Sequence, residues 1–311
     1  MIEFNAVSKS FGYSLAVKNI SMTVEEGETM VLLGTSGCGK TTTLKMINRL
    51  IEPDSGEILI VGKNIANQRP EALRKNIGFL MQNIGLFPHY TVAENIAVGP
   101  KLLGWDTNKI KQRTGELIDK LHLSEDNLVL YPHELSGGQQ QRVGLARALM
   151  TDTSILLMDE PFGALDNITR SSIHAEFKEL DELKRKTIIM VTHDVQEAFE
   201  LGDRICLMDK GEIVQIGAPK ELLYKPVNDF AKGFLENFRL TLEFKTVTLG
   251  DIKSYLPRDT AYMKQMRLSE DTSVWDTLQR FSNEKMATKE RGAFEEITNA
   301  FHKYQQSQGY E

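Results

Sequence analysis

The stretch Gly34-Thr35-Ser36-Gly37-Cys38-Gly39-Lys40-Thr41 lies between an apolar run, Met30 to Leu33, and a helical pattern that opens at Thr42. Its glycines let backbone N–H groups curl round an anion, and the N-terminus of the following helix points its positive end at the same place. Lys40 is placed to reach the outer phosphates, and Thr41 to bind Mg²⁺. We therefore expect a nucleoside triphosphate site rather than a chance Gly-rich turn. Its binding residues are Gly34, Thr35, Ser36, Gly37, Cys38, Gly39, Lys40, Thr41 and Thr42.

The composition limits the classes of protein to which the chain can belong. It has 311 residues, 41% of them hydrophobic, which suffices for one large domain or for a domain with an appendage. A formal net charge of −6 argues against a nucleic-acid partner bound mainly through phosphate contacts. Two cysteines, Cys38 and Cys206, are too few for a disulfide framework or a Cys-based zinc site, which fits a reducing cytosol.

The apolar residues are not arranged as a targeting or membrane-spanning segment. The stretch from Met1 to Ser10 lacks the basic-then-apolar order of a signal peptide, and no run of about 18 apolar residues occurs. We therefore expect a soluble protein that reaches a membrane only through a partner.

The apolar pattern predicts two kinds of sheet in one domain. Ile2 to Val7 and Leu15 to Val24 alternate as in an antiparallel sheet, whereas Ile155 to Met158 and Ile188 to Val191 are continuous apolar runs typical of buried parallel strands. Helical patterns fill Thr42 to Leu50, Thr107 to Leu121, Gln139 to Met150, Ile168 to Lys186 and Val195 to Leu201. This alternation predicts a doubly wound α/β core.

Three regions depart from that alternation. The section of about 83–150 is mostly helical and predicts a helical insert within a domain of 1–236. Ile205 to Met208 and Glu212 to Ile216 flank a short turn and predict a hairpin. The extension 237–311 has no glycine-rich motif. One face of an amphipathic helix is expected there from Phe294, Ile297, Phe301 and Tyr304.

A second helix N-terminus suited to an anion follows Leu135. Ser136, Gly137, Gly138 and Gln139 open the helical pattern there, and a serine in this position would by itself be read as an N-cap. Because this Leu-Ser-Gly-Gly-Gln string stands shortly before a strand that ends in Asp-Glu, it resembles the signature motif of ATP-binding cassette (ABC) ATPases.

The resemblance covers roughly Ile2 to Glu236 and includes the family's motifs in their order. It implies a P-loop NTPase of the ABC ATPase fold. Such a fold has a parallel core sheet, an antiparallel β subdomain and a helical subdomain, to which this chain adds a small C-terminal extension. The nucleotide implied is ATP with Mg²⁺.

The residues after the apolar strands carry the expected chemistry. Asp159 and Glu160 leave the carboxyl edge of the sheet, where Asp159 is expected to hold Mg²⁺ and Glu160 to orient and polarise the attacking water. An acidic pair or a histidine after a strand is otherwise often a turn residue. The resemblance implies that His193 contacts the γ-phosphate and the water, that Gln82 offers its oxygen to Mg²⁺ or water, and that Asp166 crosses a dimer interface.

Two further sites follow from the resemblance, each with an alternative. Phe11 matches the aromatic position that stacks on adenine, with Tyr13 as a rival for the same role. The stretch Gly85 to Tyr90 matches the surface that docks on a transmembrane partner, although Leu86 and Phe87 could instead be ordinary core residues.

The motifs occur once, so one chain is not expected to act alone. In the family, the signature of one subunit closes over the phosphate loop of another, which predicts a head-to-tail homodimer. Closure excludes water, and opening after hydrolysis supplies a movement. The expected partners are integral membrane permease subunits and, indirectly, an extracytoplasmic solute-binding protein. The chain would then lie at the cytoplasmic face of the membrane, bound through the permease.

The solute is indicated only by a subfamily resemblance. Phe87 to Ile96 and Pro100 to Trp105 look like ATPases of bacterial uptake systems for glycine betaine, carnitine or choline. The same framework serves importers of other small solutes, such as amino acids. The extension 237–311 is too short for the pair of nucleotide-sensing modules that some members carry, so it either covers the dimer or regulates it.

Two other classes of protein explain the sequence less well. Non-transport ABC proteins of translation or DNA repair usually carry two cassettes or a long coiled-coil insert, and the chain has neither. A P-loop kinase or GTPase would not explain Ser136 to Arg142, and no Asn-Lys-x-Asp guanine-reading string is found.

Overall fold

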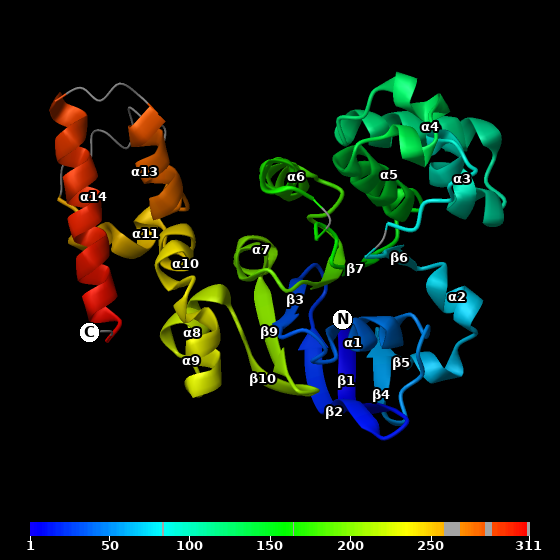
Figure 1. The fold of residues 1–311 in the computed structure, drawn as a ribbon, viewed down its shortest axis with the longest axis horizontal. Helices are drawn as coiled ribbons and strands as arrows, with labels where there is room; N and C mark the ends of the chain where they lie inside the picture. Colours follow the sequence, from blue (N-terminus) through cyan, green and yellow to red (C-terminus); the bar gives the residue numbers. More distant parts are fainter. Residues whose placement is uncertain (83, 164, 258–267, 284–287, 310–311) are drawn as a thin grey trace. The chain divides into compact units, whose positions relative to one another are not determined.

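The computed structural model divides into two compact units, Met1–Ile216 and Gly217–Glu311 (Figure 1). It describes residues 1–82, 84–163, 165–257, 268–283 and 288–309. The first unit holds every motif residue predicted above. The expected boundary after residue 236 falls inside the second unit, because helix α8 (Pro219–Tyr224) packs on helix α10 (Arg239–Thr246).

A four-stranded sheet opens the first unit. Its order is β2-β1-β4-β5, and the neighbouring strands are antiparallel, as the alternating pattern predicts. The strands are β1 (Ile2–Phe11), β2 (Ser14–Val24), β4 (Ser55–Ile60) and β5 (Lys63–Asn64).

A six-stranded sheet forms the centre of the same unit, in the order β10-β9-β3-β8-β7-β6. The pairs β3 with β8 and β9, β7 with β8, and β6 with β7 are parallel. The strands are β3 (Thr29–Gly34), β6 (Ile77–Leu80), β7 (Ile155–Asp159), β8 (Thr187–Val191), β9 (Arg204–Asp209) and β10 (Glu212–Gly217). The predicted hairpin is confirmed: β9 and β10 are neighbours joined by Lys210 and Gly211, both with positive φ, as a tight two-residue turn requires.

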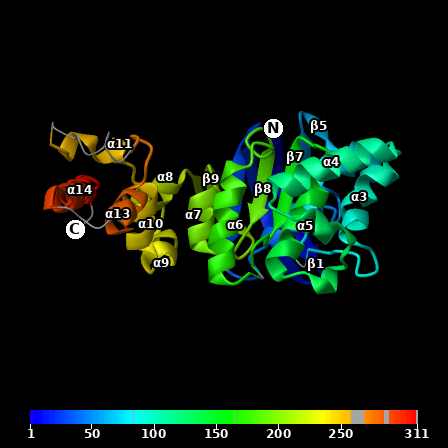
Figure 2. The same cartoon turned by 90° about the horizontal axis from the view of Figure 1, so that it is seen from above.

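The helices of the first unit cover both faces of the central sheet. They are α1 (Lys40–Ile47), α2 (Pro70–Arg74), α3 (Val92–Leu102), α4 (Thr107–Lys120), α5 (Gly137–Leu149), α6 (Asn167–Glu179) and α7 (Val195–Leu201), with short 3-10 turns at Ile65–Asn67, Glu125–Val129 and Pro132–Glu134. Leu32, Leu157 and Ile189 share one buried cluster with Leu44 of α1 and with the antiparallel sheet. Because side chains alternate along a strand, Val31 faces the other way, toward α7. Figure 2 shows α6 and α7 alongside each other on that side.

The helix predicted over Ile168 to Lys186 is too long. Helix α6 ends at Glu179, and turns follow. The chain leaves the helix here because Leu180 and Leu183 are buried and Lys186 turns inward, where its ammonium group lies 3.0 Å from Asp152.

The predicted helical insert consists of α3, α4 and α5, which Figure 1 shows grouped apart from β1 and β4. Residue 83, where the insert was expected to start, lies outside the described residues. Thr91 begins α3 with a capping box, since its hydroxyl accepts the N–H of Glu94 and the Glu94 carboxylate accepts the N–H of Thr91.

The second unit is helical and has its own core. Its helices are α8, α9 (Asp229–Glu236), α10, α11 (Leu249–Ile252), α13 (Val274–Asn283) and α14 (Thr288–Ser307), with a 3-10 turn at Lys253–Tyr255. Ile297 and Phe301 of α14 are buried as predicted and Tyr304 is partly buried, whereas Phe294 is 37% exposed and lies outside the core cluster. Ala293 takes its place in the core.

Within the described residues, no helix combines the length and the apolar character needed to cross a membrane.

Candidate active site

The phosphate loop connects β3 to α1, and the side chain of Lys40 bonds back to the start of the loop. The Lys40 side chain is buried, and its Nζ donates to the carbonyls of Gly34 and Thr35 at 2.8 and 2.9 Å. Gly39 has φ +102°, and a Cβ there would lie 2.4 Å from the carbonyl oxygen of Ala16. Only glycine fits at this position, so the sequence dictates a tight loop that ends at the N-terminus of α1.

The first of the two predicted carboxylates lies against that helix. Asp159 is buried at the end of β7, and its Oδ1 accepts a hydrogen bond from the Thr41 hydroxyl at 2.7 Å. Burial raises the pKa of Asp159 above its ordinary value, opposed by the Thr41 hydrogen bond and by Lys45, whose Nζ lies 3.9 Å from Oδ2. A hydroxyl and a carboxylate are hard oxygen donors that suit Mg²⁺.

The second carboxylate lies where two predicted partners converge on it. Oε2 of Glu160 accepts a hydrogen bond from Nε2 of Gln82 at 3.0 Å and lies 3.2 Å from Nδ1 of His193. Glu160 has φ +46°, a strained conformation for a residue with a side chain, and its N–H donates to the Val191 carbonyl at 2.9 Å. Three side chains from three neighbouring strands thus meet at the carboxyl edge of the sheet.

The signature residues form the exposed start of α5. The Ser136 hydroxyl accepts the N–H of Gln139, and Oε1 of Gln139 accepts the N–H of Ser136 at 2.9 Å, a complete capping box. Ser136 and Gly137 are exposed. Gly138 is buried, and a Cβ there would lie 2.8 Å from the Thr169 methyl group of α6. The local N-cap interpretation is therefore correct, and it leaves the helix end open to solvent.

The loop after Glu160 leads into α6. Asp166 is exposed, and its Oδ1 accepts the N–H of Thr169 at 3.1 Å. Ala164 of this loop lies outside the described residues. Arg170, one turn into the helix, donates to the Leu165 carbonyl at 2.9 Å and to Asp194 at 3.1 Å. Nothing in the sequence around Arg170 indicates that two separate loops meet at this residue, so its role could not be predicted.

Two aromatic residues compete for the role of base-stacking partner. Phe11 is 51% exposed at the end of β1, and the Nζ of Lys9 lies 5.6 Å from its ring centroid. Tyr13, in the turn that follows, is fully exposed. Both rings are accessible, so stacking on adenine by Phe11 stays a prediction.

The loop after Gln82 presents aromatic residues to solvent. Phe87 and Tyr90 are about half exposed, and their ring centroids lie 5.3 Å apart, so the alternative that placed Phe87 in the core is wrong. Leu86 is partly buried. Asn95 of α3, fully buried, binds both the N–H and the carbonyl of Phe87, at 2.7 and 3.1 Å. A polar residue on the apolar face of α3 was the available signal for this role.

Arg147 in the last turn of α5 contacts the same loop. Its guanidinium group donates to the carbonyls of Ile84 and Gly85. Burial lowers the pKa of Arg147 from its ordinary value, although such a group stays protonated at neutral pH. The helix that carries the signature at its first turn therefore contacts the exposed loop with its last turn.

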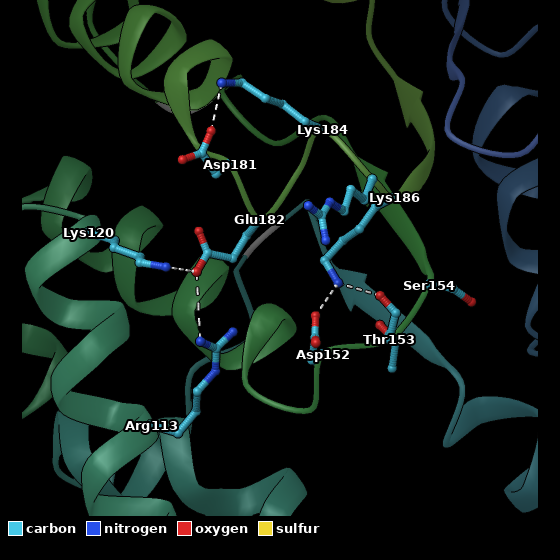
Figure 3. Close-up of a pocket in the computed structure, with 10 residues that line it drawn as sticks. Arg113, Lys120, Asp152, Thr153, Ser154, Asp181, Glu182, Lys184 and Lys186 are labelled. Atoms are coloured by element: carbon cyan, nitrogen blue, oxygen red, sulfur yellow. Dashed lines mark hydrogen bonds and ion pairs between the residues drawn. The ribbon is translucent and has the colours of Figure 1, made fainter.

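A hollow of about 660 Å³ is lined by other residues and is crossed by ion pairs (Figure 3). Arg113 and Lys120 of α4 both contact Glu182 in the segment before β8, Arg113 at 3.7 Å. Lys186 contacts Asp152 and the Thr153 carbonyl. The ion pairs of Glu182 with Arg113 and Lys120 join the helical subdomain to the core across this hollow.

Comparison with known proteins gives the family. A sequence model described as ABC transporter matches residues 17–163. The glycine betaine/carnitine/choline transport ATP-binding protein OpuCA of Bacillus subtilis (strain 168) is 52% identical over 241 residues, which are 77% of this chain and 63% of that protein. This chain therefore spans less than two thirds of the length of that relative.

Two further matches cover their proteins almost completely. The glycine betaine uptake system ATP-binding protein YehX of Escherichia coli (strain K12) is 46% identical over 281 residues, 90% of each chain, so the match extends into the second unit. The solved dimeric structure of the ATP-binding cassette MJ0796, in a post-hydrolysis state bound to ADP and Pi, superposes with a TM-score of 0.63 at 33% identity, over 70% of this chain and 98% of that one. With the fold and the order of motifs, these matches show that the chain belongs to the ATP-binding proteins of the ABC transporter family.

Proposed function

We propose that the chain binds ATP with Mg²⁺ and hydrolyses it, and that Glu160 orients and polarises the attacking water. The observation that carries this proposal is the convergence of Gln82 and His193 on one oxygen of Glu160, beside the Thr41–Asp159 pair. A general base must lie within hydrogen-bond reach of its water in a fixed orientation, and two partners on Oε2 supply that orientation.

The phosphates would lie between the loop and the start of α1. The backbone N–H groups of residues 34–42 and the ammonium group of Lys40 would bind them, with Phe11 against the adenine. Thr41 and Asp159, with Gln82, would hold Mg²⁺, which neutralises charge on the β- and γ-phosphates when bound. His193 would contact the γ-phosphate and the attacking water.

We propose further that hydrolysis needs a head-to-tail homodimer. The exposed start of α5, from Ser136 to Gln139, would close over the nucleotide of a second copy, and Asp166 would cross the interface. The dimeric cassette that binds ADP and Pi supports this arrangement, since 98% of that cassette aligns with 70% of the present chain.

The Glu160→Gln variant tests these roles. It should bind ATP as tightly as the wild type, hydrolyse it slower by a factor on the order of 10² or more, and remain dimeric by light scattering with ATP and Mg²⁺. The matched control is Glu179→Gln, an exposed carboxylate at the end of α6. Unchanged hydrolysis in Glu160→Gln would refute the base, and a strictly monomeric variant would refute the dimer.

The relatives support a role in solute uptake. We propose that the dimer drives import of glycine betaine or another quaternary amine through integral membrane permease subunits, fed by an extracytoplasmic solute-binding protein, at the cytoplasmic face of the membrane. The surface around Phe87 and Tyr90 would dock on the permease. Reconstitution with the permease in proteoliposomes tests this: quaternary amines should stimulate ATP hydrolysis, and stimulation only by amino acids would overturn the solute assignment.

A further inference from the structure

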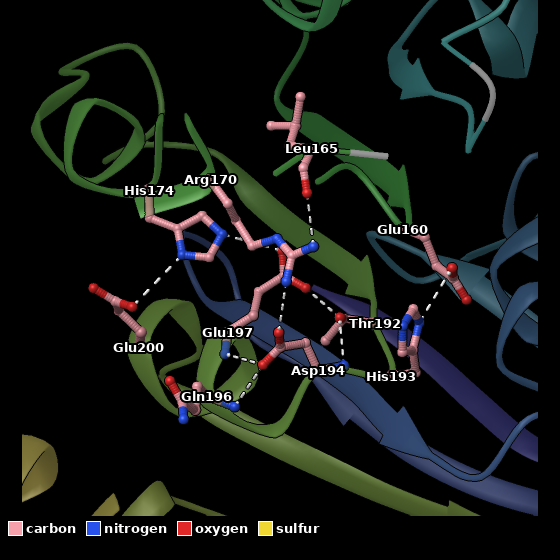
Figure 4. A network of polar contacts seen from close by, with 10 residues as sticks. All are labelled: Glu160, Leu165, Arg170, His174, Thr192, His193, Asp194, Gln196, Glu197 and Glu200. Carbon is pink, nitrogen blue, oxygen red and sulfur yellow. Dashed lines mark hydrogen bonds and ion pairs between the residues drawn. The ribbon is translucent and has the colours of Figure 1, made fainter. Parts of the chain in front are cut away.

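The guanidinium group of Arg170 joins two loops that are separate in sequence (Figure 4). One nitrogen, Nη2, donates to the carbonyl of Leu165 at 2.9 Å, and the other, Nη1, donates to Oδ2 of Asp194 at 3.1 Å. Leu165 directly precedes Asp166, and Asp194 directly follows His193. A single side chain therefore links the loop proposed to cross the dimer interface to the loop that carries His193.

The other carboxylate oxygen of Asp194 fixes the same loop to α7. Oδ1 accepts the N–H groups of Gln196 and Glu197 at 2.8 and 3.1 Å, the arrangement of a helix N-cap. On the other side of His193, the Thr192 hydroxyl donates to Glu197 and accepts the N–H of Asp194 at 3.0 Å. Both neighbours of His193 are thus bound by side chains.

The carboxylate of Glu197 lies beside the buried side chain of His174. Its Oε1 lies 3.4 Å from Nε2 of His174, an ion-pair distance with poor hydrogen-bond alignment, and Nδ1 of His174 lies 3.5 Å from Glu200. Burial alone would lower the pKa of His174, but the carboxylates of Glu197 and Glu200 outweigh it and raise the pKa. Helix α6 therefore contacts the His193 loop through Arg170, and contacts helix α7 through His174.

The His193 ring has little packing of its own. Its side chain is 61% exposed, and its Nδ1 lies 3.2 Å from Oε2 of Glu160. Its position is therefore decided by the backbone on either side of it. A displacement of about 1 Å of a catalytic group can cost on the order of 10²-fold in rate.

We propose that Arg170 is a positioning residue for hydrolysis, which sets His193 relative to Glu160 according to the conformation of the Leu165–Asp166 loop. The inference rests on the proposed function of Glu160 and His193. Because the guanidinium fork contacts both loops at once, a movement of the Leu165 loop on dimer closure is transmitted to His193.

Substitution of Arg170 separates positioning from folding. In full-length chain with ATP and Mg²⁺, Arg170→Gln should lower kcat about 10- to 100-fold with KM and ATP affinity unchanged. Arg170→Lys, which can reach only one of the two acceptors, should recover part of that loss. The matched control is Arg142→Gln. Arg142 is similarly exposed and pairs with Glu176 at 2.7 Å, so this ion pair links α5 to α6 and involves neither loop.

A double-mutant cycle with His193→Ala gives the decisive result. If Arg170 acts through His193, Arg170→Gln should cause no further loss of kcat in the His193→Ala background. A full multiplicative loss in the double variant, or an unchanged kcat in Arg170→Gln while His193→Ala is impaired, overturns the inference alone. If His193→Ala itself hydrolyses ATP normally, the proposed role of His193 fails, and the inference fails with it.

Discussion

The N-termini of α1 and α5 are both proposed to bind ATP. They differ in whether a single chain forms the whole binding site. At α1, Lys40 is buried on loop carbonyls and Thr41 is bonded to Asp159. At α5, Ser136 and Gly137 are exposed, and the capping box satisfies only the helix itself. Folding therefore builds the first site, whereas the second is only a surface until another copy meets it. Substitutions should affect binding at the first and hydrolysis at the second.

Lys40→Ala should have the largest effect, because it removes the cation from the completed site. We expect ATP affinity to fall by a factor on the order of 10² or more, from the loss of charge-assisted hydrogen bonds to phosphate. Titration with a fluorescent ATP analogue measures it. Lys45→Ala, which removes a neighbouring lysine 3.9 Å from Asp159, is the control and should lose less. Equal losses of affinity in Lys40→Ala and Glu160→Gln would contradict the roles assigned.

Gly137→Asp should distinguish the α5 site from the α1 site most clearly, because it should change hydrolysis without changing ATP affinity. An acidic residue in the first turn stabilises a helix by about 0.3–1 kcal/mol, so the melting temperature should stay constant or rise. ATP affinity should not change, whereas hydrolysis should fall on the order of 10²-fold, since the carboxylate would face a bound phosphate in the dimer. Thr107→Asp places the same charge at the exposed start of α4 as a control. Unchanged hydrolysis in Gly137→Asp would mean that α5 does not reach the nucleotide.

Glu182→Gln tests the ion pairs that hold the helical subdomain, and with it α5, to the core. We expect the free energy of unfolding to fall by about 1 kcal/mol at low salt and by less at high salt, because Lys120 is partly exposed and screened. Urea unfolding at two salt concentrations measures it. Glu116→Gln, which removes an exposed partner of the same Arg113, should cost less. A loss that does not depend on salt would show that packing, not charge, joins the two parts.

The smallest effect expected is a pH dependence of stability through His174. Its pKa is raised in the folded chain, so protonation stabilises the fold fully below about pH 6.5, and this contribution is lost as pH rises through the folded value. Between pH 6 and 9 the wild-type melting temperature should therefore fall a few °C more than that of His174→Gln. His89→Gln, an exposed histidine, is the control. Parallel curves for wild type and His174→Gln would rule out this contribution.

The sequence predicts the elements and the motif residues of this site, but not the side chains that position them. Periodicity identifies the strands because burial on one or two faces leaves a local pattern, and the motifs follow from loops at their ends. Arg170, His174, Asn95 and Arg147 act on residues distant in sequence, which no local window contains. The length of helix α6 was overestimated for the same reason, since the ion pair between Lys186 and Asp152 joins residues that are distant in sequence.

The contact between Arg147 and the exposed loop has a mechanical consequence. Helix α5 has 13 residues and is about 20 Å long, with Ser136 before its first turn and Arg147 in its last. Because the partly buried guanidinium group of Arg147 donates to two carbonyls of the loop, we expect the loop and helix α5 to move together. A movement of that loop would then also move the signature end of α5 relative to the nucleotide of the facing subunit.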